Sequence, residues 1–231
     1  MNKIGIIGAM SEELALIKSS MKAESSFKKA GYEFFSGSLG NKEVIVVLSG
    51  IGKVNAAVCT QILIDKFGVD AVINTGVAGC LGDGITIGDV VISIDAQQHD
   101  LDCSPFGDPV GTIPRMDVSV FKADEKLIKA AVKASEKVIR GRTFTGRVLS
   151  GDQVIADSET KNRLKSLFGG SCAEMEGVAI AHVCHLNGVP FVIIRNISDS
   201  ADESSDMDYP EFEKEAAHNS GAIVIEMMNL L

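Results

Sequence analysis

The sequence predicts an α/β domain in which three layers form a sandwich, with helices on both faces of a mixed, largely parallel sheet. Runs of β-branched residues alternate along the chain with segments of helical periodicity, and this alternation is typical of parallel strands joined by helices. The chain of 231 residues contains no linker-like stretch. We therefore expect residues 1–231 to fold as a single domain.

Five segments are predicted as strands because each holds several β-branched residues between glycines or charged residues. They are residues 3–9 (KIGIIGA), 43–49 (EVIVVLS), 71–76 (AVINTG), 89–96 (DVVISIDA) and 191–198 (FVIIRNIS). Strands that are apolar along their whole length are typical of parallel sheets covered on both faces. Ligands of such sheets bind at the carboxyl ends of the strands, so we expect the functional site there.

Five segments with helical periodicity are predicted to cover the sheet: residues 11–21, 54–67, 123–138, 172–188 and 210–231. Residues 99–117 (HDLDCSPFGDPVGTIPRMD) show no such periodicity and contain three prolines. A loop of this length in a compact domain is usually either functional or disordered.

The charge balance excludes some classes of partner. Lys and Arg number 22 and Asp and Glu number 31, which gives a net charge of −9. A surface this acidic is unsuited to nucleic acid or to an anionic membrane, so we expect a small-molecule partner. The first residues lack the apolar core of a signal peptide, and no apolar run reaches the ~18 residues of a membrane span. We therefore expect a cytoplasmic protein.

The cysteines agree with a reducing compartment. There are five, an odd number, and none forms a CxxC pair. We interpret them as small buried apolar side chains and predict no metal site. His182, Cys184 and His185 do cluster in AHVCHLNG, but a helix that ends at Gly188 favours such residues in its last turns, where they interact with the helix dipole.

Two glycine-rich turns follow predicted strands. GVAGCLG (76–82) lacks the G-x-G-x-x-G spacing of a dinucleotide site, and SGIGKV (49–54) lacks the four-residue spacer of a P-loop. Both are better explained as tight turns that let the backbone approach a flat ligand closely.

The acidic residues are more informative. Ser171 and Glu174 fit a capping box at the start of the helix predicted for 172–188. Glu176 would then face the apolar helix positions Cys172, Ala173, Ala179 and Ile180, where a carboxylate needs a partner. It is either a surface glutamate or a buried acid that binds ligand hydroxyls.

Two further carboxylates lie at predicted strand ends. Glu12 and Glu13 open the first helix, where acids stabilise the helix dipole, and Asp199 ends the strand predicted for 191–198. Asp199 is either the N-cap of a following turn or a catalytic group at the carboxyl edge of the sheet.

Six segments together resemble one family. In order and spacing, GIIGAMSEE, SGIGKVNAA, INTGVAGCL, LSGDQVIAD, AEMEGVAIAHVC and VIIRNISDSAD are similar to the 5'-methylthioadenosine/S-adenosylhomocysteine nucleosidases of the purine nucleoside phosphorylase superfamily, and the resemblance extends from Lys3 to the last helix. It implies hydrolysis of the N-glycosidic bond of these nucleosides, and of 5'-deoxyadenosine, to adenine and a 5-substituted ribose. It also implies methionine salvage as the pathway and a homodimer without metal or cofactor.

The resemblance further implies roles for residues of this chain. Asp199 would protonate the purine as the bond breaks, and Glu13 would orient and deprotonate the attacking water. Glu176 would bind the 2'- and 3'-hydroxyls, and Arg195 would hold the water and Glu13 in place. The remaining expected substrate contacts are Met10, Ile51, Ala78, Gly79, Val154, Ile155 through its backbone, Met175, Ser198 and Tyr209. Phe106 and Pro114 would cover the 5'-substituent of the partner subunit.

Two positions depart from the family. Many members have a serine where this chain has Val77, and a phenylalanine on the base where it has Val154. We therefore expect one water-positioning hydroxyl to be absent and base stacking to be weaker.

Three alternatives stay open. A nucleoside phosphorylase of this superfamily tends to have an arginine where this chain has Asn74. Hydrolysis of 6-amino-6-deoxyfutalosine in menaquinone synthesis uses the same machinery on a different 5'-group. A non-catalytic adenine-binding module would not need both Glu13 and Asp199.

Overall fold

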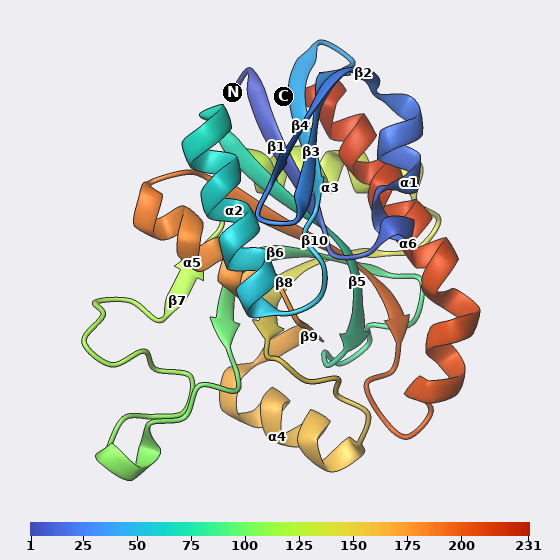
Figure 1. The fold of residues 1–231 in the computed structure, drawn as a ribbon. Helices are drawn as coiled ribbons and strands as arrows, with labels where there is room; N and C mark the ends of the chain where they lie inside the picture. The colour runs from blue at the N-terminus through green and yellow to red at the C-terminus, as the bar shows by residue number, and fades with distance from the viewer.

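The computed structural model confirms the three-layer α/β arrangement, with a mixed ten-stranded sheet between helices (Figure 1). It describes the backbone of residues 1–231 and the side chains of residues 1–205, 209 and 212–231. The predicted strands appear as β1 (Lys3–Gly8), β4 (Lys42–Leu48), β5 (Ala71–Cys80), β6 (Val90–Gln98) and β10 (Phe191–Asp199).

Strand β5 organises the sheet because it pairs with three others. Its first half is parallel to β1 on one side, nearly its whole length is parallel to β10 on the other, and its end is antiparallel to β9 (Gly170–Glu174). Strand β10 continues through β6 and β8 (Thr143–Ser150) to β9, so these strands close into a ring. The ends of β1, β5, β9 and β10 consequently meet in one place.

The sequence reasoning missed several elements. The strands β2 (Lys22–Lys29) and β3 (Tyr32–Leu39) form an edge hairpin, β7 (Val120–Lys122) pairs with β6, and α4 (Ser158–Phe168) covers β9. Strand β2 is exposed at nearly every position, and β8 contains a glycine and an arginine. Neither has the run of β-branched residues on which the predictions were based.

Two helical layers sandwich the sheet. The helices α1 (Ser11–Ser20), α3 (Glu125–Val138) and α6 (Ser205–Leu230) form one layer and bury residues such as Leu14, Leu127 and Val224 in a core shared with one face of the sheet. The helices α2 (Lys53–Phe67) and α5 (Gly177–Asn187) form the other layer, where Leu63 and Ile180 pack on the opposite face of the sheet. Among the helices described, none combines the length and apolarity needed to cross a membrane.

One predicted helix begins later than expected. Cys172, Ala173 and Glu174 belong to β9, and α5 starts only at Gly177. The capping box predicted for Ser171 and Glu174 is therefore wrong. The local pattern fits a helix start, but residues 170–174 pair with both β8 and β5, and these long-range hydrogen bonds decide the conformation.

The loop at 99–117 is irregular, as predicted, apart from one short 3-10 helix at Ser104–Phe106. Four of the cysteines are buried without disulfides, and Cys103, in this loop, is half-buried.

Candidate active site

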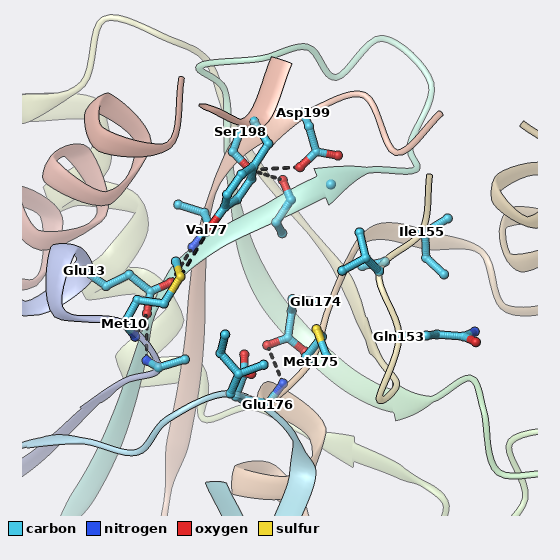
Figure 2. Close-up of a pocket in the computed structure, with 17 residues that line it drawn as sticks. Met10, Glu13, Val77, Gln153, Ile155, Glu174, Met175, Glu176, Ser198 and Asp199 are labelled. Carbon is cyan, nitrogen blue, oxygen red and sulfur yellow. Dashed lines mark hydrogen bonds between the residues drawn. The ribbon is translucent and has the colours of Figure 1, made fainter. Parts of the chain in front are cut away.

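A cavity of about 280 Å³ lies where the ends of β1, β5, β9 and β10 meet (Figure 2). All the predicted site residues line it except Arg195, Phe106 and Pro114. The residues brought together are Met10, Glu13, Ile51, Ala78, Gly79, Val154, Ile155, Met175, Glu176, Ser198, Asp199 and Tyr209. In Figure 2, Glu13, Glu176 and Asp199 approach the cavity from three separate segments.

Glu13 is held by backbone amides from two elements. It is the third residue of α1 and only 4% exposed. One carboxylate oxygen, Oε2, accepts hydrogen bonds from the amides of Ala9 (2.7 Å) and Met10 (3.0 Å), and Oε1 accepts one from Val77 of β5 (3.1 Å). Burial raises the pKa of Glu13, against the opposing effects of the positive charge of Arg195 and of these amides. Glu13 therefore caps its helix and also faces the cavity, whereas Glu12 is exposed.

Asp199 ends β10, shapes the turn that follows and lines the cavity, and its catalytic role stays a prediction. Its Oδ1 accepts hydrogen bonds from the Ala201 amide (2.9 Å) and the Ser205 hydroxyl (3.1 Å), which shape the following turn, and its Oδ2 accepts one from Ser198 Oγ (3.0 Å). A Cβ on Gly79 would lie 2.8 Å from Asp199 Oδ1, so glycine is needed for this close approach. The carboxylate is thus fixed while it lines the cavity.

Glu176 lies in the turn between β9 and α5, not on an apolar helix face as predicted. It is 6% exposed, and its Oε1 accepts a hydrogen bond from the amide of Gly52, at 2.8 Å. Burial raises its pKa to about 7, the negative charge of Glu174 contributes in the same direction, and Arg195 opposes them. Glu176 is therefore buried and not a surface glutamate, while its binding of ligand hydroxyls stays a prediction.

Arg195 is fully enclosed behind the cavity wall. Its Nη2 donates to Asn74 Oδ1 (2.6 Å) and forms a short ion pair with Glu174, which also accepts hydrogen bonds from the amide of Gly177 and from Ser150 Oγ. Among the described contacts, none is a hydrogen bond from Arg195 to Glu13. The positive charge of Arg195 acts on Glu13 by opposing the rise in its pKa that burial causes.

Several cavity residues were not predicted. Ala9, Gln153, Ala173 and Glu174 line the cavity. Val77, noted above as a departure from the family, lines it as well. The spacing Glu-x-Glu in AEMEG was a signal for Glu174, but the capping-box interpretation assigned that residue elsewhere. Among the described residues, no group of three His, Cys, Asp or Glu side chains is arranged to hold a metal ion.

Phe106 and Pro114 lie on the 99–117 loop, away from the cavity lining. Phe106 is 90% exposed, which is unusual for so large an apolar side chain. Their role toward a partner subunit stays a prediction.

The raised pKa of Glu176 predicts a pH-dependent stability. In the unfolded chain a glutamate has a pKa of ~4.3. Between this pH and about 7, Glu176 is therefore deprotonated in the unfolded state while it still holds its proton in the folded state. The contribution of Glu176 to the free energy of unfolding is therefore complete below pH ~4.3 and is lost as the pH rises toward 7. Relative to Glu176→Gln, the wild type should lose stability over this range in urea titrations. Glu12→Gln is the control, because the pKa of exposed Glu12 is lowered, chiefly by a backbone hydrogen bond. A stability difference from Glu176→Gln that does not change with pH would contradict the assignment.

Comparisons with known proteins identify the family of this chain. The family model described as the phosphorylase superfamily matches residues 3–229. A 5'-methylthioadenosine/S-adenosylhomocysteine nucleosidase of Shewanella pealeana is 44% identical over 230 residues, which cover 99% of this chain and 100% of the relative.

Solved structures match the chain along its whole length. The 5'-methylthioadenosine/S-adenosylhomocysteine nucleosidase of Neisseria meningitidis, in complex with methylthio-immucillin-A, has a TM-score of 0.96 and 40% identity, with 100% of both chains covered. A futalosine hydrolase of Helicobacter pylori has a TM-score of 0.94 and 37% identity, covering 100% of this chain and 98% of that one. The chain therefore belongs to the phosphorylase superfamily and, within it, to the family of 5'-methylthioadenosine/S-adenosylhomocysteine nucleosidases.

Proposed function

We propose that this chain hydrolyses the N-glycosidic bond of 5'-methylthioadenosine and S-adenosylhomocysteine, and also of 5'-deoxyadenosine, to adenine and the 5-substituted ribose. The observation that carries the proposal is the convergence of three buried carboxylates, Glu13, Glu176 and Asp199, on one cavity. The proposed setting is methionine salvage in the cytoplasm, as expected from the cysteine usage and the substrate.

The leaving group determines the role of Asp199. Adenine leaves poorly as an anion, so an acid must protonate the purine ring as the bond breaks. In the proposal Asp199 supplies this proton, and the contacts from Ser198, Ala201 and Ser205 keep its carboxyl group in place. Ala78 and Gly79 line the same part of the cavity wall, where small side chains leave room for a flat ring. The backbone of Ile155 would bind the edge of the base.

The sugar determines the roles of the other two acids. As the bond breaks, the ribose gains oxocarbenium-like positive charge, which nearby carboxylates stabilise. Glu176 would bind the 2'- and 3'-hydroxyls, with Met175 against the ring. Glu13 would orient a water molecule and accept its proton. Met10, which accepts a hydrogen bond from Tyr209 at 3.3 Å, and the exposed Ile51 and Val154 would complete the walls.

The charge around the cavity favours water over phosphate as the nucleophile. Its described lining includes the acids Glu13, Glu174, Glu176 and Asp199 and no lysine or arginine. Asn74 is buried, and its side chain is engaged by the Ile7 carbonyl and by Arg195. A phosphate dianion would therefore meet like charges without a cation to compensate them.

A second candidate is hydrolysis of 6-amino-6-deoxyfutalosine. The similarity to the futalosine hydrolase of Helicobacter pylori favours it as the alternative. The proposed roles of Glu13, Glu176 and Asp199 would be unchanged, because the two reactions differ only in the 5'-group. Adenine release from each nucleoside, measured side by side, separates the candidates.

The role of Asp199 predicts the effect of Asp199→Asn. The amide keeps the shape of the side chain but has no proton to transfer, so kcat should fall by ~10²–10⁴-fold, as is typical for loss of a general acid. Substrate binding should survive, as measured by calorimetry. Asp157→Asn is the control, because Asp157 caps α4 and does not line the cavity. Adenine release near the wild-type rate by Asp199→Asn would refute the assignment.

The role of Glu13 predicts that phosphate is not a reactant. The wild type should run at full rate in phosphate-free buffer and release free 5-methylthioribose, and millimolar phosphate should change neither rate nor product. Glu13→Gln should abolish turnover while nucleoside binding remains measurable, because an amide cannot accept the proton of water. Glu12→Gln should behave as the wild type. A product phosphorylated at C1, or a rate that rises with phosphate, would identify a phosphorylase instead.

The exposed Phe106 predicts a homodimer in which the 99–117 loop reaches the partner's cavity. Phe106→Ala should raise KM for 5'-methylthioadenosine more than for adenosine, because only the 5'-tail loses a contact. Leu167→Ala, at another exposed position, is the control. Sedimentation of the wild type as a monomer at assay concentration, or an equal effect on both substrates, would argue against this arrangement.

A further inference from the structure

The loop after β8, residues 151–156, forms one wall of the cavity without regular secondary structure. Gln153, Val154 and Ile155 line the cavity, and Val154 is 75% exposed. In the proposed function this loop binds the base, so its position must be fixed relative to the residues that bind the sugar. Within the loop, Ile155 is buried in an apolar cluster with Leu81 and Leu164, whereas residues 152–154 are exposed and need other contacts to hold them.

A cluster of three charged side chains attaches the start of this loop to two other segments. Lys53, the first residue of α2, donates through Nζ to Asp100 Oδ1 at 2.6 Å and lies 3.9 Å from Asp152 Oδ2. The amide of Asp152 donates to Asp100 Oδ2 at 2.8 Å. The two oxygens of Asp100 therefore join α2 to the loop.

The first turn of α2 joins the loop to the carboxylate proposed to bind the sugar. Two consecutive amides point to different acids, since that of Gly52 donates to Glu176 Oε1 and that of Lys53 donates to Asp152 Oδ1, both at 2.8 Å. A shift of Asp152 would be transmitted through one peptide unit to the hydrogen bond of Glu176. The base wall and the sugar-binding acid thus share one support.

The floor beneath the loop is equally close-packed. His99 is 2% exposed, its amide donates to the carbonyl of Ser150 at 3.0 Å, and its ring lies against Gly151. A Cβ on Gly151 would lie 2.4 Å from His99 Cε1, so no larger residue fits at the start of the loop without displacing it. The same Cβ would lie 3.1 Å from Asp100 Cγ, so the His99 ring and Asp100 both pack against the start of the loop.

We propose that Lys53, Asp100 and Asp152 are positioning residues that fix the 151–156 loop relative to Glu176 and so align the base and sugar ends of the cavity. The alignment of base and sugar rests on the proposed function, whereas the attachment of the 151–156 loop to Glu176 does not. Exposed ion pairs usually contribute little. Here the Lys53 and Asp100 side chains are only 19% and 22% exposed, and both aspartates also bind backbone amides.

The test compares Lys53→Met, Asp100→Asn and the double variant. Lys53 and the Asp152 amide bind different oxygens of Asp100, and asparagine replaces one of these oxygens by an NH2 donor, so one of the two contacts is lost. Methionine at 53 keeps the apolar stem without the charge. Hydrogen exchange of a peptide spanning 151–156 should accelerate by about tenfold in each, as for loss of a charge-assisted hydrogen bond. Exchange in the core strand β1 should not change. Because the residues act as one unit, the double variant should exchange no faster than the more affected single variant.

Binding and kinetics supply independent readouts. Adenine affinity, measured by calorimetry without any turnover, should fall about tenfold in the same variants, and KM for 5'-methylthioadenosine should rise more than kcat falls. Lys53→Arg should restore most of the affinity. Lys137→Met is the matched control, because it removes an ion pair with Glu226 that is remote from the cavity.

Two outcomes would overturn the proposal. Unchanged exchange at 151–156 in both single variants would show that the cluster does not hold the loop. Additive effects of Lys53→Met and Asp100→Asn on exchange at 151–156, accompanied by a matching loss of thermal stability and faster exchange in β1, would show a general structural role. Failure of the proposed hydrolase function would appear differently, as normal adenine binding and exchange in a wild type that releases no adenine.

Discussion

The buried guanidinium of Arg195 is the interaction on which the rest of the site depends. Three acids, Glu13, Glu174 and Glu176, lie in its surroundings and are each less than a tenth exposed. One cation cannot compensate three buried negative charges, and the structure resolves this unequally. Glu174 takes the direct ion pair, while burial raises the pKa of Glu13 and of Glu176. Burial therefore decides the direction of both pKa shifts, and the positive charge of Arg195 only opposes it.

The closed ring of strands explains how these groups come together. Glu13 follows β1, Glu176 follows β9 and Asp199 ends β10, and all three strands are neighbours of β5. Backbone amides then fix each carboxylate, from Val77 for Glu13, from Gly52 for Glu176 and from Ala201 for Asp199. Amides of strands and tight turns hardly move, so the acids are pre-organised before any ligand arrives.

Much of the fold and of the candidate site could be predicted from the sequence, wherever neighbouring residues in the chain determine the structure. Runs of β-branched residues located β1, β4, β5, β6 and β10, and the resemblance of strand-end motifs located nearly the whole cavity lining. The errors arose where distant partners decide the outcome. Residues 170–174 resemble a helix start until β5 and β8 pair with them. Arg195 could not be oriented from sequence, because the acid that attracts it most, Glu174, had been assigned to a helix cap.

The ion pair between Arg195 and Glu174 also affects whether water or phosphate can act as the nucleophile. A phosphate nucleophile needs a cation whose charge is not already neutralised, and a desolvated Arg–carboxylate pair offers little to a further anion. Arg195 is engaged by Glu174 and Asn74 and is sealed from the cavity. The excess negative charge of the lining, which disfavours phosphate, is also suited to a ribose that becomes positive as its bond breaks. Under the proposed function, one electrostatic arrangement therefore both excludes the competing nucleophile and stabilises the transition state.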